Sequence, residues 1–184
     1  MPHISARAAE RSERTARRKV PTAEPTKATA AEPVGSYGEL DRFVGAVARA
    51  TPYQLVEFER HGVGGRLLKD FSRRLDIPQM RIFEMIGVPK ATAEKKVASD
   101  GQLSGSGGQS AVGLARLLAK AQDMVSRSTA REARDFDAAK WLGHWLQLPQ
   151  PALGGRKPCD LLDTPSGLAV VLKLLGSLES GAYQ

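Results

Sequence analysis

The sequence predicts an all-α protein in which a disordered N-terminal tail precedes a helix-turn-helix-like domain and a helical C-terminal domain. Two observations lead to this prediction. Apolar residues recur three or four positions apart, which is the period of an amphipathic helix. Prolines and glycines stand where these apolar stripes begin and end, as they do at helix termini. The three parts are expected at residues 1–36, 37–109 and 110–184.

The N-terminal tail is expected to be disordered because it contains spaced prolines and almost no large apolar side chains. Basic residues between Arg11 and Lys19 could contact DNA phosphates as a flexible arm. A solvated tail without a function of its own is the favoured alternative.

Residues 37–109 contain successive helical stripes. The apolar positions that define them are Leu40, Phe43, Val44 and Val47, then Tyr53, Val56 and Phe58, then Leu67, Leu68, Phe71 and Leu75, and finally Met80, Phe83 and Ile86. A further short helix is expected from about Lys90 to Ser99, after a turn that contains Gly87. Helices joined by a tight glycine-containing turn are typical of a helix-turn-helix.

In a helix-turn-helix the last of these helices lies in the DNA major groove, and side chains near its N-terminus meet bases and phosphates. The candidate DNA-binding residues are therefore Lys90, Thr92, Lys95 and Lys96. The alternative is a three-helix packing module whose charges form a solvated face.

The C-terminal domain is expected to follow a flexible linker, Gly101–Gln109, with Ser110 capping the next helix. The linker lacks the preceding strand and the Gly-Lys-Ser/Thr ending of a phosphate-binding loop. The next helix is strongly amphipathic and is expected to be central to the core; its apolar residues are Leu114, Leu117, Leu118, Ala121, Met124 and Val125. Another helix is expected from about Ala130, and it carries Trp141 and Trp145. These two tryptophans are interpreted as core residues, with an interface anchor as the alternative.

The last thirty-odd residues form a double-glycine loop, a short turn opened by Pro158 and a final helix that Thr164 caps ahead of Pro165. The apolar stripe of this helix consists of Leu168, Val171, Leu172, Leu175 and Leu178. Glycines near its end predict that Ala182, Tyr183 and Gln184 leave the body as a short tail.

Two patterns in this segment carry a resemblance. The pattern W-L-x-x-P-x-P-A-L-G-G-x-x-P-x-x-L-L-x-T-x-x-G, followed by L-L-G-x-L-E-x-G-x-Y, resembles the toxin-binding domain of Xre-type (ParS/MbcA-like) antitoxins, partners of RES-domain toxins. The resemblance covers roughly Trp141 to Gln184, with weaker similarity back to about Thr51. One departure is Ser177, where the family often has arginine.

The resemblance implies an antitoxin that neutralises a NAD-consuming or ADP-ribosylating toxin, its C-terminal end closing the toxin's NAD site. The toxin-binding residues it implies are Leu153, Gly154, Gly155, Leu178, Gly181, Tyr183 and Gln184. It also implies a homodimer within a complex with toxin and operator DNA, and autoregulation of the operon. The alternative function is a stand-alone transcriptional regulator whose C-terminal domain dimerises.

The candidate DNA-reading helix also resembles its Xre counterpart, which commonly has Thr-Leu-x-Arg-Arg. Here Ala93 replaces the leucine, with an expected loss of roughly 1.5 to 3 kcal/mol of burial. The basic pair is Lys95-Lys96, and lysine lacks the bidentate fork of arginine.

Charge and composition bound the function. The chain carries a formal net charge of +7, and residues 60–100 hold nine basic against five acidic side chains, whereas residues 140–184 hold four against three. Nucleic acid is therefore not the expected partner of the C-terminal end. A single cysteine, Cys159, is interpreted as a small buried apolar residue. No catalytic cluster, metal site or cofactor is expected, and no apolar run reaches the ~20 residues that span a bilayer, so a cytoplasmic binding protein is expected.

Overall fold

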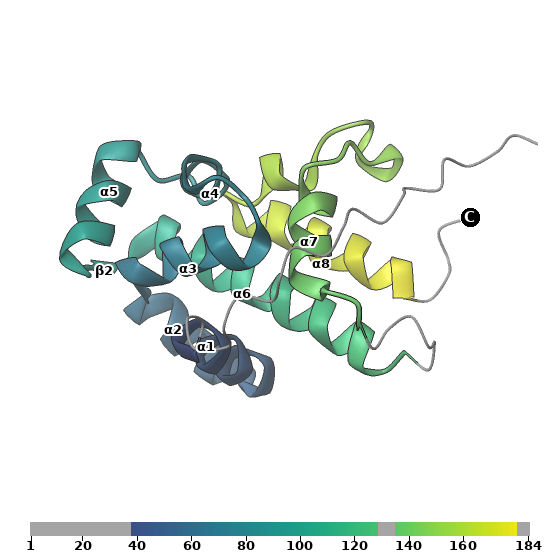
Figure 1. Ribbon diagram of the computed structural model, residues 1–184, viewed down its shortest axis with the longest axis horizontal. Helices are drawn as coiled ribbons and strands as arrows, with labels where there is room; N and C mark the ends of the chain where they lie inside the picture. The colour runs from purple at the N-terminus through teal and green to yellow at the C-terminus, as the bar shows by residue number, and fades with distance from the viewer. Residues whose placement is uncertain (1–37, 129–134, 180–184) are drawn as a thin grey trace, which may run out of the picture. The chain divides into compact units, whose positions relative to one another are not determined.

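The computed structural model of the chain describes residues 38–128 and 135–179, and these residues are mostly helical, which confirms the all-α prediction (Figure 1). The predicted disordered tail lies outside the described residues. The elements in chain order are α1 (Gly38–Arg49), α2 (Pro52–His61), β1 (Val63–Gly64), α3 (Gly65–Leu75), α4 (Gln79–Met85), α5 (Lys90–Ser99), β2 (Gln102–Leu103), α6 (Gly105–Ser126), α7 (Ala138–Leu146), η2 (Pro151–Leu153), η3 (Pro158–Leu161) and α8 (Pro165–Glu179).

The helices of the first half begin and end where the local sequence directs them. Thr51 and Gln54 form a capping box at the start of α2, in which the Thr51 hydroxyl accepts the Gln54 N–H and the Gln54 side chain accepts the Thr51 N–H. Asp76 and Asp100 end α3 and α5 in the left-handed conformation. The predicted apolar stripe of α3 is buried as a whole, so this helix packs as the sequence indicates.

Two short strands were not predicted. Strand β1 pairs with β2 in antiparallel fashion, with Val63 opposite Leu103 and Gly64 opposite Gln102. Strands of two residues are too short to show the apolar alternation that identifies a half-buried strand. The pair ties the start of α3 to the start of α6.

The prediction of a flexible linker ending at Gln109 is wrong, because α6 begins at Gly105. The glycines there serve close packing. A Cβ on Gly107 would lie 2.3 Å from Val88 Cγ2, and one on Gly108 would lie 2.5 Å from the Leu103 carbonyl oxygen. Ser110 lies inside the helix and caps nothing, so the boundary expected between residues 109 and 110 falls within α6.

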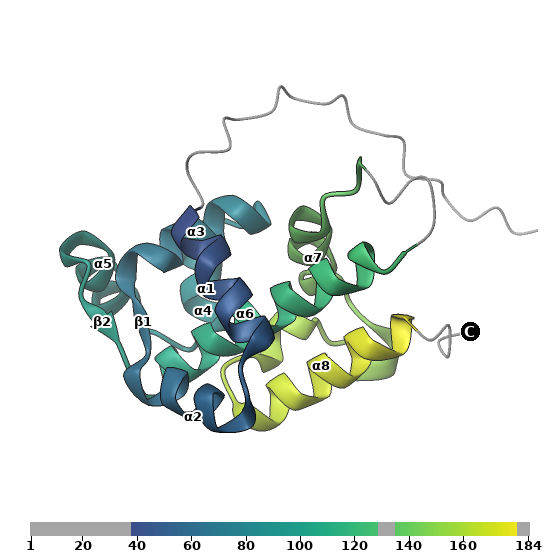
Figure 2. The same ribbon diagram turned by 90° about the horizontal axis from the view of Figure 1, so that it is seen from below.

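Helix α6 lies in the middle of the fold and is its longest helix among the described residues (Figures 1 and 2). It contacts α1 and α2 from the first half of the chain and α7 and α8 from the second half. Most residues of its first four turns are buried, and this confirms its predicted central place in the core. One helix therefore carries packing surfaces for both halves.

Helix α7 begins at Ala138, whereas a helix was predicted from about Ala130. Of the residues in between, the structure describes 135–137, and these lie outside the α-helix, so the prediction is wrong there. Asp137 is the N-cap and its carboxylate accepts the N–H groups of Ala139 and Lys140. The helix approaches α3 very closely, because a Cβ on Gly143 would lie 1.9 Å from the Leu75 carbonyl oxygen. Glycine is the one residue that this approach admits.

Candidate functional site

The candidate DNA-reading helix α5 packs tightly against α3. A Cβ on Gly65 would lie 2.0 Å from the Lys96 carbonyl oxygen, and the Gly65 N–H donates to the Gly101 carbonyl at 3.1 Å. Ala93, the residue that replaces the family's leucine, is fully buried on this side of α5. The small side chain of Ala93 therefore fits the short distance between the backbones of α3 and α5, and position 93 is not exposed to solvent.

The four predicted DNA-binding residues all lie on α5, but they differ in availability. Thr92 and Lys95 are exposed. Lys90 is exposed and forms an ion pair with Glu94, with 3.8 Å between Nζ and Oε1. Lys96 is half-buried, and its stem lies along Gly101. Thr92 and Lys95 are the side chains best placed to reach a partner.

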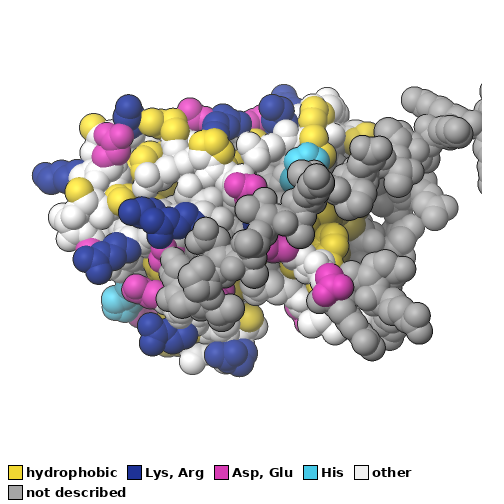
Figure 3. All heavy atoms as spheres, viewed as in Figure 1, with side chains coloured by type: hydrophobic (Ala, Val, Ile, Leu, Met, Phe, Trp, Pro, Cys, Tyr) yellow, Lys and Arg dark blue, Asp and Glu magenta, His cyan; other side chains and the backbone are white. Residues whose placement is uncertain are grey.

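Basic side chains continue from α5 onto α3. On the face shown in Figure 3, Lys and Arg side chains gather over the end of the molecule that carries α3 and α5. Lys69 and Arg73 of α3 are exposed. Arg66 is partly neutralised, because its Nε lies 3.4 Å from Asp100 Oδ2. This end of the described chain offers a positive surface suited to phosphates.

The double-glycine loop is a closed turn. The Gln150 carbonyl accepts the N–H groups of Leu153 and Gly155, each at 3.0 Å, and the Gln150 N–H donates to the Arg156 carbonyl at 3.0 Å. Gly154 and Gly155 have φ of 64° and 81°, a region that other residues rarely adopt. Both glycines are exposed, while Leu153 is half-buried against the core. The predicted binding residues here thus present backbone, with Leu153 holding the turn in place.

Helix α8 leads toward the C-terminus. Thr164 caps it as predicted, since its Oγ1 accepts the Gly167 N–H at 3.1 Å. Leu178 is half-buried against the core, so this predicted binding residue also has a packing role. The Ser177 hydroxyl donates to the Leu174 carbonyl at 2.7 Å within the helix. The other predicted residues, Gly181, Tyr183 and Gln184, lie outside the described residues.

Aromatic residues lie on α7 and just before it, and the two tryptophans among them were predicted to be core residues, with an interface anchor as the alternative. Trp145 is buried, but Trp141 is half-buried and Phe136 is 44% exposed. The Trp141 ring stacks on Trp145 with 6.1 Å between centroids and 17° between planes, and Phe136 lies 6.1 Å from Trp141. Only Trp145 therefore follows the core interpretation fully.

The described residues contain no arrangement suited to catalysis. Cys159 is buried, as expected, and burial raises the pKa of its thiol to about 11, so it is a poor nucleophile at neutral pH. No group of three or more metal-ligating side chains occurs in the described ranges. Within the same ranges, no helix is both long and apolar enough to cross a bilayer.

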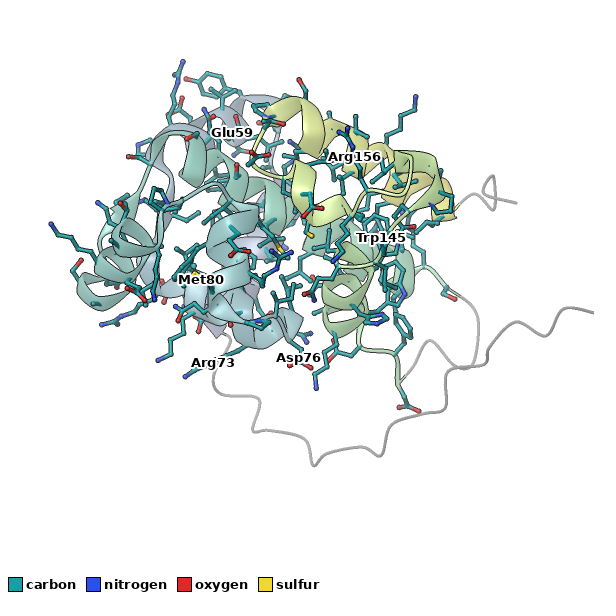
Figure 4. All side chains as sticks on the ribbon, turned by 90° about the horizontal axis from the view of Figure 1, so that it is seen from above. Glu59, Arg73, Asp76, Met80, Trp145 and Arg156 are labelled. Atoms are coloured by element: carbon teal, nitrogen blue, oxygen red, sulfur yellow. The ribbon has the colours of Figure 1, made fainter. Side chains whose placement is uncertain are left out.

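The two candidate regions are formed by different elements of the fold. Figure 4 shows Trp145 and Arg156 in the C-terminal half of the fold, and Arg73 and Met80 on the other side, with α3 and α4. The positive surface over α3 and α5 is therefore distinct from the surface formed by α7, the double-glycine turn and α8.

Comparison with known proteins gives a family match to one of these surfaces. Residues 136–181 match the family model described as the antitoxin Xre/MbcA/ParS C-terminal toxin-binding domain. The chain is 40% identical over 138 residues to the Prs ADP-ribosylating antitoxin of Sphingobium sp. (strain YBL2), which covers 75% of this chain and 86% of that protein. It is 24% identical over 107 residues to the antitoxin Xre of Yersinia enterocolitica, which covers 58% of this chain and 66% of the relative.

Proposed function

Because the chain belongs to the Xre/MbcA/ParS family of antitoxins, we propose that it neutralises a RES-domain toxin by placing its C-terminal end in the toxin's NAD site. The observation that supports this proposal most is the match of residues 136–181 to the toxin-binding domain of the family. These residues include the double-glycine turn and α8, which hold the predicted contacts Leu153, Gly154, Gly155 and Leu178.

The geometry of α8 favours binding to the toxin through the residues that follow the helix. Thr164 fixes where the helix begins, and buried leucines fix which side faces the core. The helix runs to Glu179, so the terminal residues Gly181, Tyr183 and Gln184 follow directly from an anchored element. A tyrosine combines apolar area with a polar tip, which suits an anchor in a nucleotide pocket.

Deletion of Ala182 to Gln184 tests the proposal. We expect the shortened protein to unfold at the same temperature as the full chain and to protect cells from the toxin poorly. A matched control is Lys173→Ala, which removes an exposed side chain of α8 and leaves the C-terminal residues in place. Full protection by the shortened protein would contradict closure of the NAD site and leave docking by the folded surface alone.

We also propose that α5 binds operator DNA, so that the protein regulates its own operon as a homodimer in complex with the toxin. The support is the α4-turn-α5 arrangement and the exposed Thr92 and Lys95. Co-purification with the product of the neighbouring gene separates this proposal from a stand-alone regulator. A regulator that acts alone would bind its operator without retaining that product.

A further inference from the structure

Four apolar residues extend along one side of α7 and its two flanks: Phe136, Trp141, Trp145 and Leu148, here called the aromatic patch. Phe136 is 44% exposed and Leu148 is 42% exposed. The rings of Phe136, Trp141 and Trp145 follow one another at 6.1 Å between successive centroids. Leu148 comes one turn after Trp145, whose carbonyl accepts its N–H at 3.2 Å. Phe136 and Leu148 are thus the exposed ends of the patch, whereas Trp141 is half-buried and Trp145 is buried.

The chemistry of the patch is that of a protein interface. Tryptophan is enriched among the residues that carry most of the binding energy, and it works best in the centre of a contact ringed by polar groups. The exposed side chains of Lys140 and His144 lie on the same helix and provide such a polar edge. A clustered apolar surface of this kind on a folded protein is a sign of an interaction site, whereas a single exposed leucine is not.

The predicted toxin contacts on the folded part of the chain are few for a protein interface. A stable protein interface buries about 800 Å² on each partner and involves roughly 20 to 30 residues a side. The predicted toxin contacts on the described part of the chain are Leu153, Gly154, Gly155 and Leu178, so further residues of the domain have to take part in a stable contact. Within residues 136–181, the aromatic patch offers the largest side chains for this purpose.

We propose that the aromatic patch is a second docking surface for the toxin, separate from the C-terminal end, and this inference rests on the proposed function. The toxin is favoured over other occupants because all four residues fall within the match to the toxin-binding domain, which begins at Phe136. The patch takes an apolar surface of the toxin with a recess for an indole ring. Nucleic acid does not fit, because Lys140 is the one Lys or Arg from Phe136 to Leu148.

The test measures binding of purified full-length variants to the product of the neighbouring gene, taken as the candidate RES-domain protein. Trp141→Ala removes the centre of the patch, and Leu148→Glu charges an exposed end outside α7 where folding is not at stake. We expect each to weaken binding about tenfold or more. Tyr53→Ala is the matched control, since Tyr53 is an aromatic residue 72% exposed on α2, outside the match, and it is expected to bind as the wild type does.

The outcomes separate this inference from the function on which it rests. If the wild-type chain does not bind the RES-domain protein, the proposed function fails. If the wild type binds, and Leu148→Glu binds equally well while deletion of Ala182 to Gln184 weakens binding, the docking role of the patch is overturned and the function stands. If Leu148→Glu instead converts a dimer to monomer in sedimentation equilibrium with unchanged toxin affinity, the patch belongs to a second copy of this chain.

Discussion

Arg74 of α3 and Asp137 at the start of α7 form an ion pair between the two halves of the fold, in which one guanidinium nitrogen contacts both carboxylate oxygens. Arg74 Nη1 lies 3.0 Å from Asp137 Oδ1 and 3.3 Å from Oδ2. The same Oδ1 accepts the N–H groups of Ala139 and Lys140, so one carboxylate both caps α7 and holds it to α3. Both side chains are partly exposed, with relative accessibilities of 25% and 39%.

Substitution at this pair is expected to separate its two roles. Arg74→Ala removes the ion pair alone and should lower the free energy of unfolding by about 0.5 to 1 kcal/mol, because exposed ion pairs contribute little. Asp137→Ala removes the helix cap as well and should cost about 1 kcal/mol more. Urea unfolding of both variants and of the double variant measures the coupling. Equal losses in the two single variants would show that the cap contributes nothing.

The contact of α7 with α3 predicts that Gly143→Ala is strongly destabilising. The added Cβ would lie 1.9 Å from a backbone oxygen of Leu75, so the helices must move apart. We expect a loss of about 3 kcal/mol in the free energy of unfolding. Gly45→Ala in α1 is the control: its Cβ meets only the end of the flexible Arg49 side chain, at 3.4 Å, and a better helix former should stabilise by up to about 1 kcal/mol. A mild effect of Gly143→Ala would contradict the close approach.

The packing of α5 predicts that the family's leucine is not tolerated at position 93. Ala93→Leu adds volume where the backbones of α3 and α5 are close, and overpacking should lower the melting temperature at a cost of about 1 to 3 kcal/mol. Ala98→Leu on the exposed side of the same helix should change stability by less than about 0.5 kcal/mol. Stabilisation by Ala93→Leu would show instead that alanine leaves unused space.

If α5 contacts DNA phosphates, Lys95→Ala should weaken binding to the protein's own upstream region at every salt concentration. The slope of log affinity against log salt should fall in magnitude by about 1, since one phosphate contact is lost. Lys173→Ala, an exposed lysine of α8, should leave both quantities unchanged. Gel shifts in several salt concentrations provide the data. Equal retardation of random and upstream DNA would exclude specific binding.

The buried thiol of Cys159 predicts a loss of stability in alkali. Burial, followed by the hydrogen bond to Asp160, raises the thiol pKa from 9.0 to about 11. The folded protein therefore holds this proton more tightly than the unfolded chain does. The contribution of the protonated thiol to the stability of the fold is complete below about pH 9 and is lost as the pH rises toward 11. Compared with Cys159→Ala, the wild type should lose stability over this range, and its thiol should react slowly with a disulfide reagent at pH 8 until urea unfolds it. Fast reaction in the folded protein would contradict the burial.

Local chemistry made several elements predictable. Thr51 and Thr164 each stand before a proline and cap their helices through backbone N–H groups, so the starts of α2 and α8 follow from three or four residues. The bounds of α5 follow in the same way from Pro89 ahead of it and an aspartate after it. Such signals lie within one helical turn, and the sequence displays them in full.

What escaped prediction depends on contacts between distant residues. Glycines near Gly105 suggest a flexible linker until Val88 and Leu103 are known to lie against them. The start of α7 was missed although Asp137 is a good N-cap residue, because alanine, arginine and glutamate, which are good helix formers, precede it. The exposure of Phe136 depends on which side of α7 faces the core, and this is decided by Gly143 against Leu75. For the candidate site, the sequence therefore indicated the residues of the turn and of α5 but not the aromatic patch as a surface.

Both proposed binding surfaces, the one over α3 and α5 and the one formed by α7, the double-glycine turn and α8, depend on the folding of helix α6. Because α1, α2, α7 and α8 all pack on it, a protease cut or a destabilising substitution within α6 is expected to abolish the proposed DNA binding and the proposed toxin binding together. Such a protein has a single lifetime for its two proposed activities, so repression of the operon and restraint of the toxin would end together. Chimaeras between relatives should accordingly be joined outside residues 105–126, with α6 taken from one parent together with α1, α2, α7 and α8.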